Sequence, residues 1–228
     1  MQPHTKSQAF CTKAAKTLQI GILDLSSNTR ISAGFSIFHG RLAPGDEAKI
    51  DILFNSAGIL DMRTWLDTPL DRQRAIFDIN VIGVMNCIHV AFPKLCNNDG
   101  ARIVTMSSTA AVYGIPSMTV YSASKFAVRA LTEGLNIEFR KHGIWVCDIM
   151  VAFVDTPMVR EALHKAASVE EMGVNVRPEE VAATVWCTAK EKKVHHFVND
   201  ASEDFMAHLE GLPFAERDAF IAKSMGYV

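Results

Sequence analysis

Short apolar runs alternate along the chain with longer stretches in which apolar residues recur at helical spacing. The apolar runs, each suited to a buried strand, are 18–25 (LQIGILDL), 50–58 (IDILFNSAG), 101–108 (ARIVTMSS) and 144–154 (IWVCDIMVAFV). The stretches with helical spacing are 71–95, 121–143 and 177–193. Strands that alternate with helices of this length are typical of β-α-β units. The pattern predicts an α/β fold with a Rossmann-like, doubly wound parallel sheet.

We find no internal repeat or low-complexity linker that would separate two domains. We therefore predict one domain over residues 1–200, in which 1–49 are atypical. Residues 201–228 read as two short helices around the sequence GLP. This stretch is expected to form a C-terminal helical appendage or a lid.

The composition of the 228 residues, 49% hydrophobic and 21% charged, is that of an ordinary globular protein. A net charge of −2 gives no reason to expect nucleic acid or an anionic membrane as a partner. No uninterrupted apolar run reaches the roughly 18 residues that a membrane span needs. We expect neither a nucleic-acid partner nor a membrane span.

Cysteine and histidine positions bear on metal binding and on the compartment. The five cysteines are scattered and include no C-x-x-C, which argues against a disulfide framework and a zinc site and fits a reducing cytosol. Adjacent His195 and His196 would point to opposite faces of a strand, so we predict no metal site there. The N-terminus lacks the apolar segment of a secretory signal, so a cytoplasmic location is expected.

Polar residues gather where the predicted strands end. In a parallel sheet, ligands bind beyond the carboxyl ends of the strands. Tyr121 and Lys125 share one helix face, and a neighbouring ammonium is expected to lower the pKa of the phenol. The polar residues expected at this edge are Asn55, Asn80, Ser107, Ser108, Tyr121, Lys125 and Thr156.

The joint pattern resembles the short-chain dehydrogenase/reductase family over roughly residues 50–195. The matching features are NSAG (55–58), Asn80 in NVIG, Ser108, Tyr121-x3-Lys125 and the turn VDTPM. The resemblance implies an NAD(P)-dependent Rossmann enzyme that interconverts a secondary alcohol and a ketone.

The resemblance also implies catalytic roles for four residues. Tyr121 would exchange a proton with the substrate oxygen while a hydride moves between the substrate carbon and a nicotinamide. Lys125 would lower the pKa of Tyr121 and bind the nicotinamide ribose. Ser108 would polarise the carbonyl as an oxyanion donor does. Asn80 would hold a water that connects Lys125 to solvent, at a point where its helix bends.

Further residues would hold NAD or NADP, according to the same resemblance. Asn55, Ala57 and Gly58 would line the adenosine side, where small residues let the backbone approach. Val154 and Thr156 would contact the carboxamide. The full expected cofactor-binding set is Asp24, Asn55, Ala57, Gly58, Tyr121, Lys125, Val154 and Thr156.

The chain departs from the family in two places, and both concern the cofactor. The glycine-rich turn T-G-x-x-x-G-x-G, whose backbone reaches the pyrophosphate, cannot be drawn through Gly21, Gly34, Gly40 and Gly45. Val151–Ala152 also stands where the family has Pro-Gly, so side chains there are expected to crowd the nicotinamide. The fold is therefore expected to be shortened or altered at its N-terminus.

Two assignments of the strand at 18–25 are open. In the first it is the family's second strand and the central first strand is missing; Asp24 then binds the adenine ribose and favours NAD over NADP. That arrangement leaves backbone groups of a central position unpaired. In the second, the strand fills the central position and residues 26–34 (SSNTRISAG) replace the phosphate loop, which places Asp24 near the pyrophosphate. We favour the first for its sequence.

Three functions remain open at this stage. The leading one is an NAD(P)-dependent oxidoreductase acting on a small-molecule alcohol or ketone. The second is a cofactor-incompetent relative that serves as a binding or oligomerisation module. The third is a chain with an altered or shortened start that folds incompletely. Helices 71–95 and 121–143 are the family's usual dimer contact, so we expect a homodimer or homotetramer through them.

Overall fold

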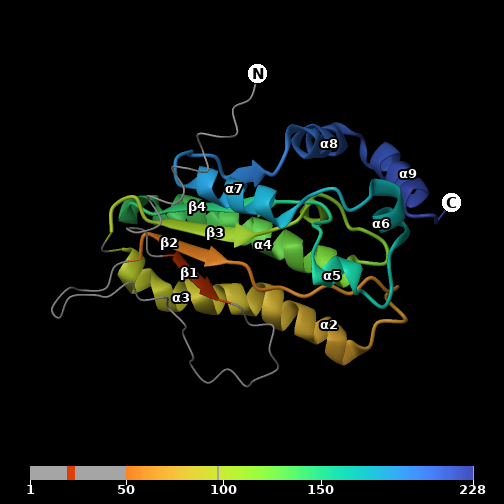
Figure 1. Cartoon of the computed structure of the whole chain (residues 1–228), viewed down its shortest axis with the longest axis horizontal. Helices are drawn as coiled ribbons and strands as arrows, with labels where there is room; N and C mark the ends of the chain where they lie inside the picture. The colour runs from red at the N-terminus through yellow and green to blue at the C-terminus, as the bar shows by residue number, and fades with distance from the viewer. Residues whose placement is uncertain (1–19, 24–49, 97, 228) are drawn as a thin grey trace.

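One parallel sheet organises the molecule. The computed structural model describes residues 20–23, 50–96 and 98–227. The sheet has the order β1-β2-β3-β4-β5, and every neighbouring pair is parallel (Figure 1). Its strands are β1 (Ile20–Leu23), β2 (Ile52–Asn55), β3 (Arg102–Met106), β4 (Trp145–Met150) and β5 (His195–Phe197). The predicted α/β parallel sheet is confirmed.

Helices lie between the strands from β2 onward and follow β5. They are α2 (Leu70–Phe77), the π-helix η1 (Asp78–Ile82), α3 (Gly83–Leu95), the 3-10 helix η2 (Thr109–Ala111), α4 (Thr119–Glu138), the 3-10 helix η3 (Phe139–His142), α5 (Pro157–Arg160), α6 (Ala167–Met172), α7 (Pro178–Thr188), α8 (Asp200–Gly211) and α9 (Phe214–Ser224). The three predicted helical stretches match α2-η1-α3, α4 and α7, with boundaries that differ by a few residues.

Side chains alternate between the two faces of the sheet, and helices cover both. Leu53, Ile103 and Val146 pack on one face with α3 and the end of α4. Ile52, Val104, Cys147 and Ile149 pack on the other face, where Val185 of α7 lies against them. Figure 1 shows α3 and α7 on opposite sides of the strands. The sheet is therefore wound on both faces, as predicted.

The N-terminal strand lies directly beside the strand that carries Asn55. β1 pairs with β2 in parallel, from Ile20 opposite Ile52 to Leu23 opposite Asn55. This direct pairing leaves no place for another strand between the two, so the structure matches the second N-terminal assignment and corrects our preference for the first. Asp24 lies outside the described residues, as do residues 26–34.

Residues 70–95 form one helical unit that is both long and apolar. By length and composition alone, Leu70–Leu95 could cross a membrane, which the search for uninterrupted apolar runs did not anticipate. Core helices pass the same test. Here Ile76, Val84, Ile88 and Leu95 are buried in the fold, which accounts for part of the apolar composition.

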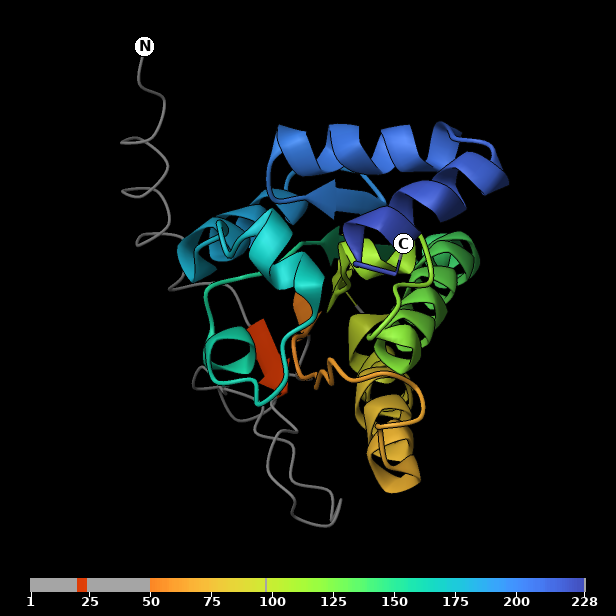
Figure 2. The ribbon, with the colours of Figure 1, turned by 90° about the vertical axis from the view of Figure 1, so that its right-hand side faces the viewer.

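The carboxyl ends of the strands face the viewer in Figure 2. On this side, α5, α6 and α9 lie beyond the strand ends, and α8 and α9 form a separate pair of helices along one edge (Figures 1 and 2). Residues distant in sequence are thus brought to the edge where ligands bind in parallel sheets.

Candidate active site

A cavity of about 730 Å³ lies at the carboxyl ends of the strands. Its walls include Phe54 and Ser56 at the end of β2, residues 106–110 after β3 and residues 151–154 after β4. Helices α4 to α9 supply most of the remaining sides. The site thus occupies the position that the topology of a parallel sheet favours.

Small buried residues bring the start of α4 close to the sheet. Ser122 and Ser124 are fully buried. The Ser122 hydroxyl donates to the carbonyl of Tyr113 at 2.8 Å and also to that of Ala110. Larger side chains at these positions would hold the helix away. The first two turns of α4 therefore place Tyr121 and Lys125 in the cavity wall.

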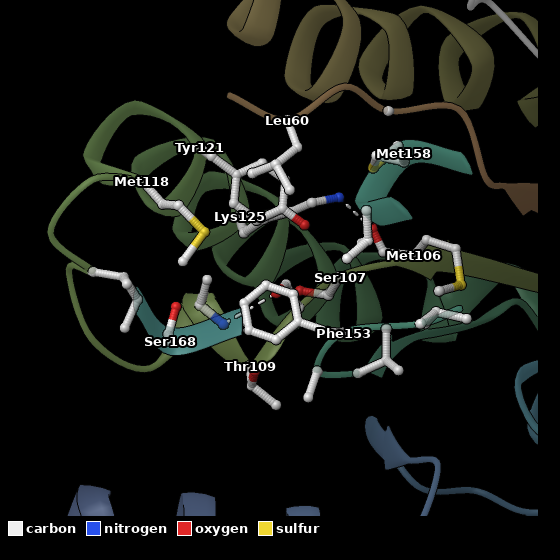
Figure 3. Close-up of a pocket in the computed structure, with 18 of the residues that line it drawn as sticks. Leu60, Met106, Ser107, Thr109, Met118, Tyr121, Lys125, Phe153, Met158 and Ser168 are labelled. Atoms are coloured by element: carbon white, nitrogen blue, oxygen red, sulfur yellow. Dashed lines mark hydrogen bonds between the residues drawn. The ribbon is translucent and has the colours of Figure 1, made fainter. Parts of the chain in front are cut away.

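The ammonium of Lys125 is buried, with the residue only 5% exposed. Its Nζ donates to the carbonyl of Met106 at 2.8 Å, drawn as a dashed line in Figure 3. Burial lowers the pKa of Lys125 from 10.5 to about 8, although the negative charge of Asp148 acts in the opposite direction. The Lys125 side chain is therefore buried and has a pKa close to neutral pH.

The pKa of Tyr121 differs from our expectation. Burial raises the pKa of the phenol, and the hydrogen bond with Ser108 only partly offsets this. Lys125 Nζ lies 5.6 Å from the centroid of the Tyr121 ring and hydrogen bonds to Met106 instead. Burial decides the direction of the shift in this arrangement, so the prediction that the ammonium lowers the tyrosine pKa is not met.

Two serines follow β3 and both line the cavity. The Ser108 hydroxyl caps η2 by accepting from the Ala110 N–H at 3.1 Å, and it acts on the Tyr121 phenol in the direction that lowers its pKa. Ser107 Oγ is buried and has no hydrogen-bond partner within the described part of the chain. Ser108 is thus the serine in contact with the tyrosine, whereas Ser107 offers an unused donor.

Asn80 joins three segments that surround the site. Its Oδ1 accepts from the Ile59 N–H at 2.8 Å, and its Nδ2 donates to the Ile59 carbonyl and to Ser124 Oγ, each at 3.0 Å. The residue sits in η1, a π-helical turn between α2 and α3, and the expected bend of the helix remains a prediction. The Asn80 side chain therefore holds the turn after β2 against α4. The water that Asn80 was expected to bind remains a prediction.

The expected cofactor residues divide into two groups. Gly58, Val154 and Thr156 line the cavity together with Tyr121, Lys125 and Ser108, whereas Asn55 and Ala57 do not. The Asn55 amide donates to Thr105 Oγ1 at 3.2 Å, so it faces the neighbouring strand.

Gly58 permits a close approach. A Cβ on this residue would lie 3.3 Å from Asn80 Oδ1 and 3.9 Å from Lys125 Nζ. Val151 and Ala152, which stand where the family has Pro-Gly, both belong to the cavity wall.

A row of polar residues crosses the sheet beneath α4, and sequence reasoning missed it. The strand registers place Asn55, Thr105, Asp148 and His195 side by side. Asp148 Oδ1 lies 2.9 Å from His195 Nδ1, and His195 Nε2 lies 3.2 Å from the carboxylate of Glu133 on α4. The signal in the sequence was the acid within the apolar run WVCDIM. The row links the surface to the neighbourhood of Lys125.

Burial and pairing act against each other at Asp148 and His195. Burial raises the pKa of Asp148, while the hydrogen bond and charge of His195 pull it down. Burial lowers the pKa of His195, but its hydrogen bond to Asp148 and the carboxylate charge outweigh this and raise it. No group of three His, Cys, Asp or Glu residues within the described ranges could hold a metal ion.

We predict that Asp148→Asn lowers the pKa of Lys125 below its value of about 8. The carboxylate favours the ammonium, so removing its charge favours the neutral amine. The measurement is the pH titration of the Lys125 Cε signal in protein labelled with ¹³C-lysine. Asp204→Asn on the exposed side of α8 is the control and should leave the curve unchanged. An unshifted curve in Asp148→Asn would contradict the assigned electrostatic link.

We predict that Asn80→Ala lowers the free energy of unfolding by about 1–3 kcal/mol, because the backbone groups of Ile59 lose their partners. Chemical denaturation measures this value. The exposed Asp78→Ala in the same π-helical turn is the control and should change it by no more than about 0.5 kcal/mol. Equal losses in the two variants would show that the Asn80 side chain contributes nothing specific.

Comparisons with known proteins point the same way as the site. Oxidoreductase UcpA of Salmonella typhimurium is 37% identical over 121 residues, which are 53% of this chain and 46% of that protein. An uncharacterized oxidoreductase of Staphylococcus saprophyticus is 34% identical over 110 residues, 48% of this chain and 47% of that protein. The chain thus spans about half the length of these relatives.

Solved structures share the fold. A short chain dehydrogenase from Burkholderia cenocepacia in complex with NADP has a TM-score of 0.65 and 24% identity, with 77% of this chain and 71% of that one covered. A short chain dehydrogenase from Mycobacterium paratuberculosis bound to NAD has a TM-score of 0.59 and 26% identity, with 68% and 65% covered. The family model for short chain dehydrogenases matches residues 10–167, more than half of the sequence. The chain therefore belongs to the short-chain dehydrogenase/reductase family.

Proposed function

We propose that the protein is an NAD(P)-dependent oxidoreductase that interconverts a secondary alcohol and a ketone. The observation that carries this proposal is the convergence of Ser108, Tyr121 and Lys125 in one cavity wall, where Ser108 is the serine that acts on the phenol. A hydroxyl donor, a proton donor and a cation are the groups that carbonyl reduction needs around the substrate oxygen.

The described residues fit the nicotinamide end of such a cofactor. The absence of a side chain at Gly58 lets the backbone approach Asn80 and Lys125 closely, and Gly58, Val154 and Thr156 belong to the same wall. The buried Ser107 hydroxyl supplies a polar group without another partner in the described ranges. Lys125 would bind the ribose, and Val154 and Thr156 the carboxamide. Asp24 lies outside the described residues, and with the second strand assignment it no longer favours NAD over NADP.

The bound cofactor would supply or accept the hydride, and the protein would handle the proton. Burial keeps Tyr121 in its neutral form, so the phenol can donate its proton to a carbonyl oxygen. Ser108 would donate to the same oxygen and stabilise its developing charge. The Lys125 ammonium, which bonds to the Met106 carbonyl and lies 5.6 Å from the ring centroid, would bind the ribose rather than set the pKa of the phenol. Alcohol oxidation would use the same groups in reverse.

We predict that Tyr121→Phe lowers kcat by about 10²–10⁴-fold, because the substrate oxygen loses its proton donor, while NADH and NADPH bind as in the wild type. Calorimetric titration measures cofactor binding, and a panel of ketones measures turnover. Tyr227→Phe, which removes an exposed phenol bonded to Ser117, is the matched control and should keep full activity. A well-folded wild-type chain that binds neither cofactor at millimolar concentration would refute the proposal.

The second candidate is a binding or oligomerisation module, and exposed apolar side chains favour it. They lie on α3 and α4 or at the adjoining η1: Ile82, Met85, Val90, Phe126 and Ile137. Apolar patches of this kind mark protein–protein contacts. We propose that the protein forms a homodimer or homotetramer through these helices, with or without cofactor chemistry.

We predict that Phe126→Glu shifts the protein toward monomer, because a carboxylate would replace a ring buried between subunits. Sedimentation velocity measures the change. Leu163→Glu is the control, since Leu163 is 95% exposed and lies away from both helices, in the segment between α5 and α6. A wild-type monomer at all concentrations would contradict the interface.

A further inference from the structure

The cavity wall also contains residues outside the proposed cofactor set, and we call the space that they line the compartment. They come from the C-terminal helix pair and from the segment before α4. The apolar lining of the compartment includes Ile115, Phe205, Met206, Leu209, Phe220 and Met225. Several of these residues belong to one hydrophobic cluster with Met150 at the end of β4. The C-terminal helices therefore form part of the wall of the site.

Charged groups of α8 and α9 lie outside this wall. Asp218 accepts from the Tyr113 hydroxyl at 2.7 Å, Glu210 pairs with Arg129 at 2.6 Å, and Glu203 pairs with Lys193 at 2.6 Å. These contacts are exposed and fasten the helix pair to the rest of the molecule. The polar residues of α8 and α9 form these contacts on the outer face of the helix pair. The inner face presents apolar side chains to the cavity.

Charge inside the cavity is confined to one position. Among the lining residues that the structure describes, Lys125 is the single charged side chain, and its Nζ is bonded to Met106. A carboxylate or phosphate on the substrate body would lose its hydration without gaining a partner in the compartment. The lining therefore selects against charged substrates.

One buried hydroxyl in the wall has no use in the proposed reaction. Ser168 on α6 is 1% exposed, and its Oγ has no hydrogen-bond partner within the described residues. Figure 3 shows it in the lining of the cavity, on another segment of the wall from Tyr121. An orphaned buried hydroxyl is costly unless a ligand completes its bond. It is placed to bind a second oxygen of a molecule that reacts at Tyr121.

We propose that the substrate is an uncharged, mainly apolar alcohol or ketone of bicyclic size or larger, with a second neutral oxygen that Ser168 binds. Its apolar body lies against α8 and α9. The volume of about 730 Å³, shared with the nicotinamide end, has room for such a molecule, whereas a three-carbon ketone would leave apolar surface uncovered. This inference rests on the proposed function.

Three probes with one skeleton test the chemistry: decalin-1,5-dione, 1-decalone and a 1-decalone carboxylate. Their binding to the full chain, alone and with NADH, is measured by calorimetry or saturation-transfer NMR. We expect the dione to bind best and the carboxylate to bind at least tenfold more weakly than 1-decalone. Equal or tighter binding of the carboxylate would overturn the apolar assignment.

Variants test the two parts of the wall. Ser168→Ala should weaken binding of the dione by roughly 3- to 10-fold and leave 1-decalone unchanged, as the loss of one hydrogen bond predicts. Ser202→Ala on α8, which is not in the lining, is the matched control. A dione affinity unaffected by Ser168→Ala would remove the second oxygen from the proposal.

Phe220→Glu places a carboxylate in the α9 wall and should weaken both neutral probes at least tenfold. Ala219→Glu, one residue away and outside the lining, should have no effect. Unchanged binding in Phe220→Glu would show that α9 does not wall the compartment.

The cofactor arm of the titration separates the two proposals. Binding of NADH without binding of any neutral probe overturns the substrate inference and leaves the oxidoreductase. Binding of the probes without either cofactor refutes the oxidoreductase and leaves an apolar ligand site.

Discussion

The rest of the site depends on the burial of one ammonium group. A lysine Nζ removed from water needs an acceptor and a compensating charge. Lys125 has the Met106 carbonyl at 2.8 Å and the negative charge of Asp148 across the interface between α4 and the sheet. Asp148 is itself buried and is held by His195, which reaches Glu133 near the surface. The buried charge is thus supported by a continuous set of partners.

The partners of Lys125 come from segments that are far apart in the sequence. Asp148 and His195 meet because β4 and β5 pair in one register, and Glu133 joins them because α4 crosses the same strands. Asn80 adds a further link, since it ties η1 to the turn after β2 and to Ser124 of α4. A shift of α4 would therefore disturb Tyr121, Lys125 and the polar row together.

Local patterns in the sequence were sufficient for four of the five strands and the main helices, and the family resemblance was sufficient to bring Ser108, Tyr121 and Lys125 to one cavity. They were not sufficient for contacts set by register or by long-range packing. Asp148 was visible only as an interruption of an apolar run, because its partner His195 lies on another strand. The pKa of Tyr121 was misjudged because desolvation depends on the whole cavity, not on the neighbour four residues away. The place of α8 and α9 in the cavity wall likewise follows from tertiary packing alone.

The π-helical turn at η1 also determines how the faces of α2 and α3 are rotated relative to each other about the helix axis. Each residue of an α-helix advances the chain by about 100° around its axis, so a turn with one extra residue rotates everything after it. The turn lets α2 pack toward α4 while α3 turns its apolar side to the sheet, although the backbone runs through without a loop. A one-residue deletion there would restore regular helical geometry and still misalign the two faces. This stretch of helix therefore has a fixed residue count even where individual side chains are exposed.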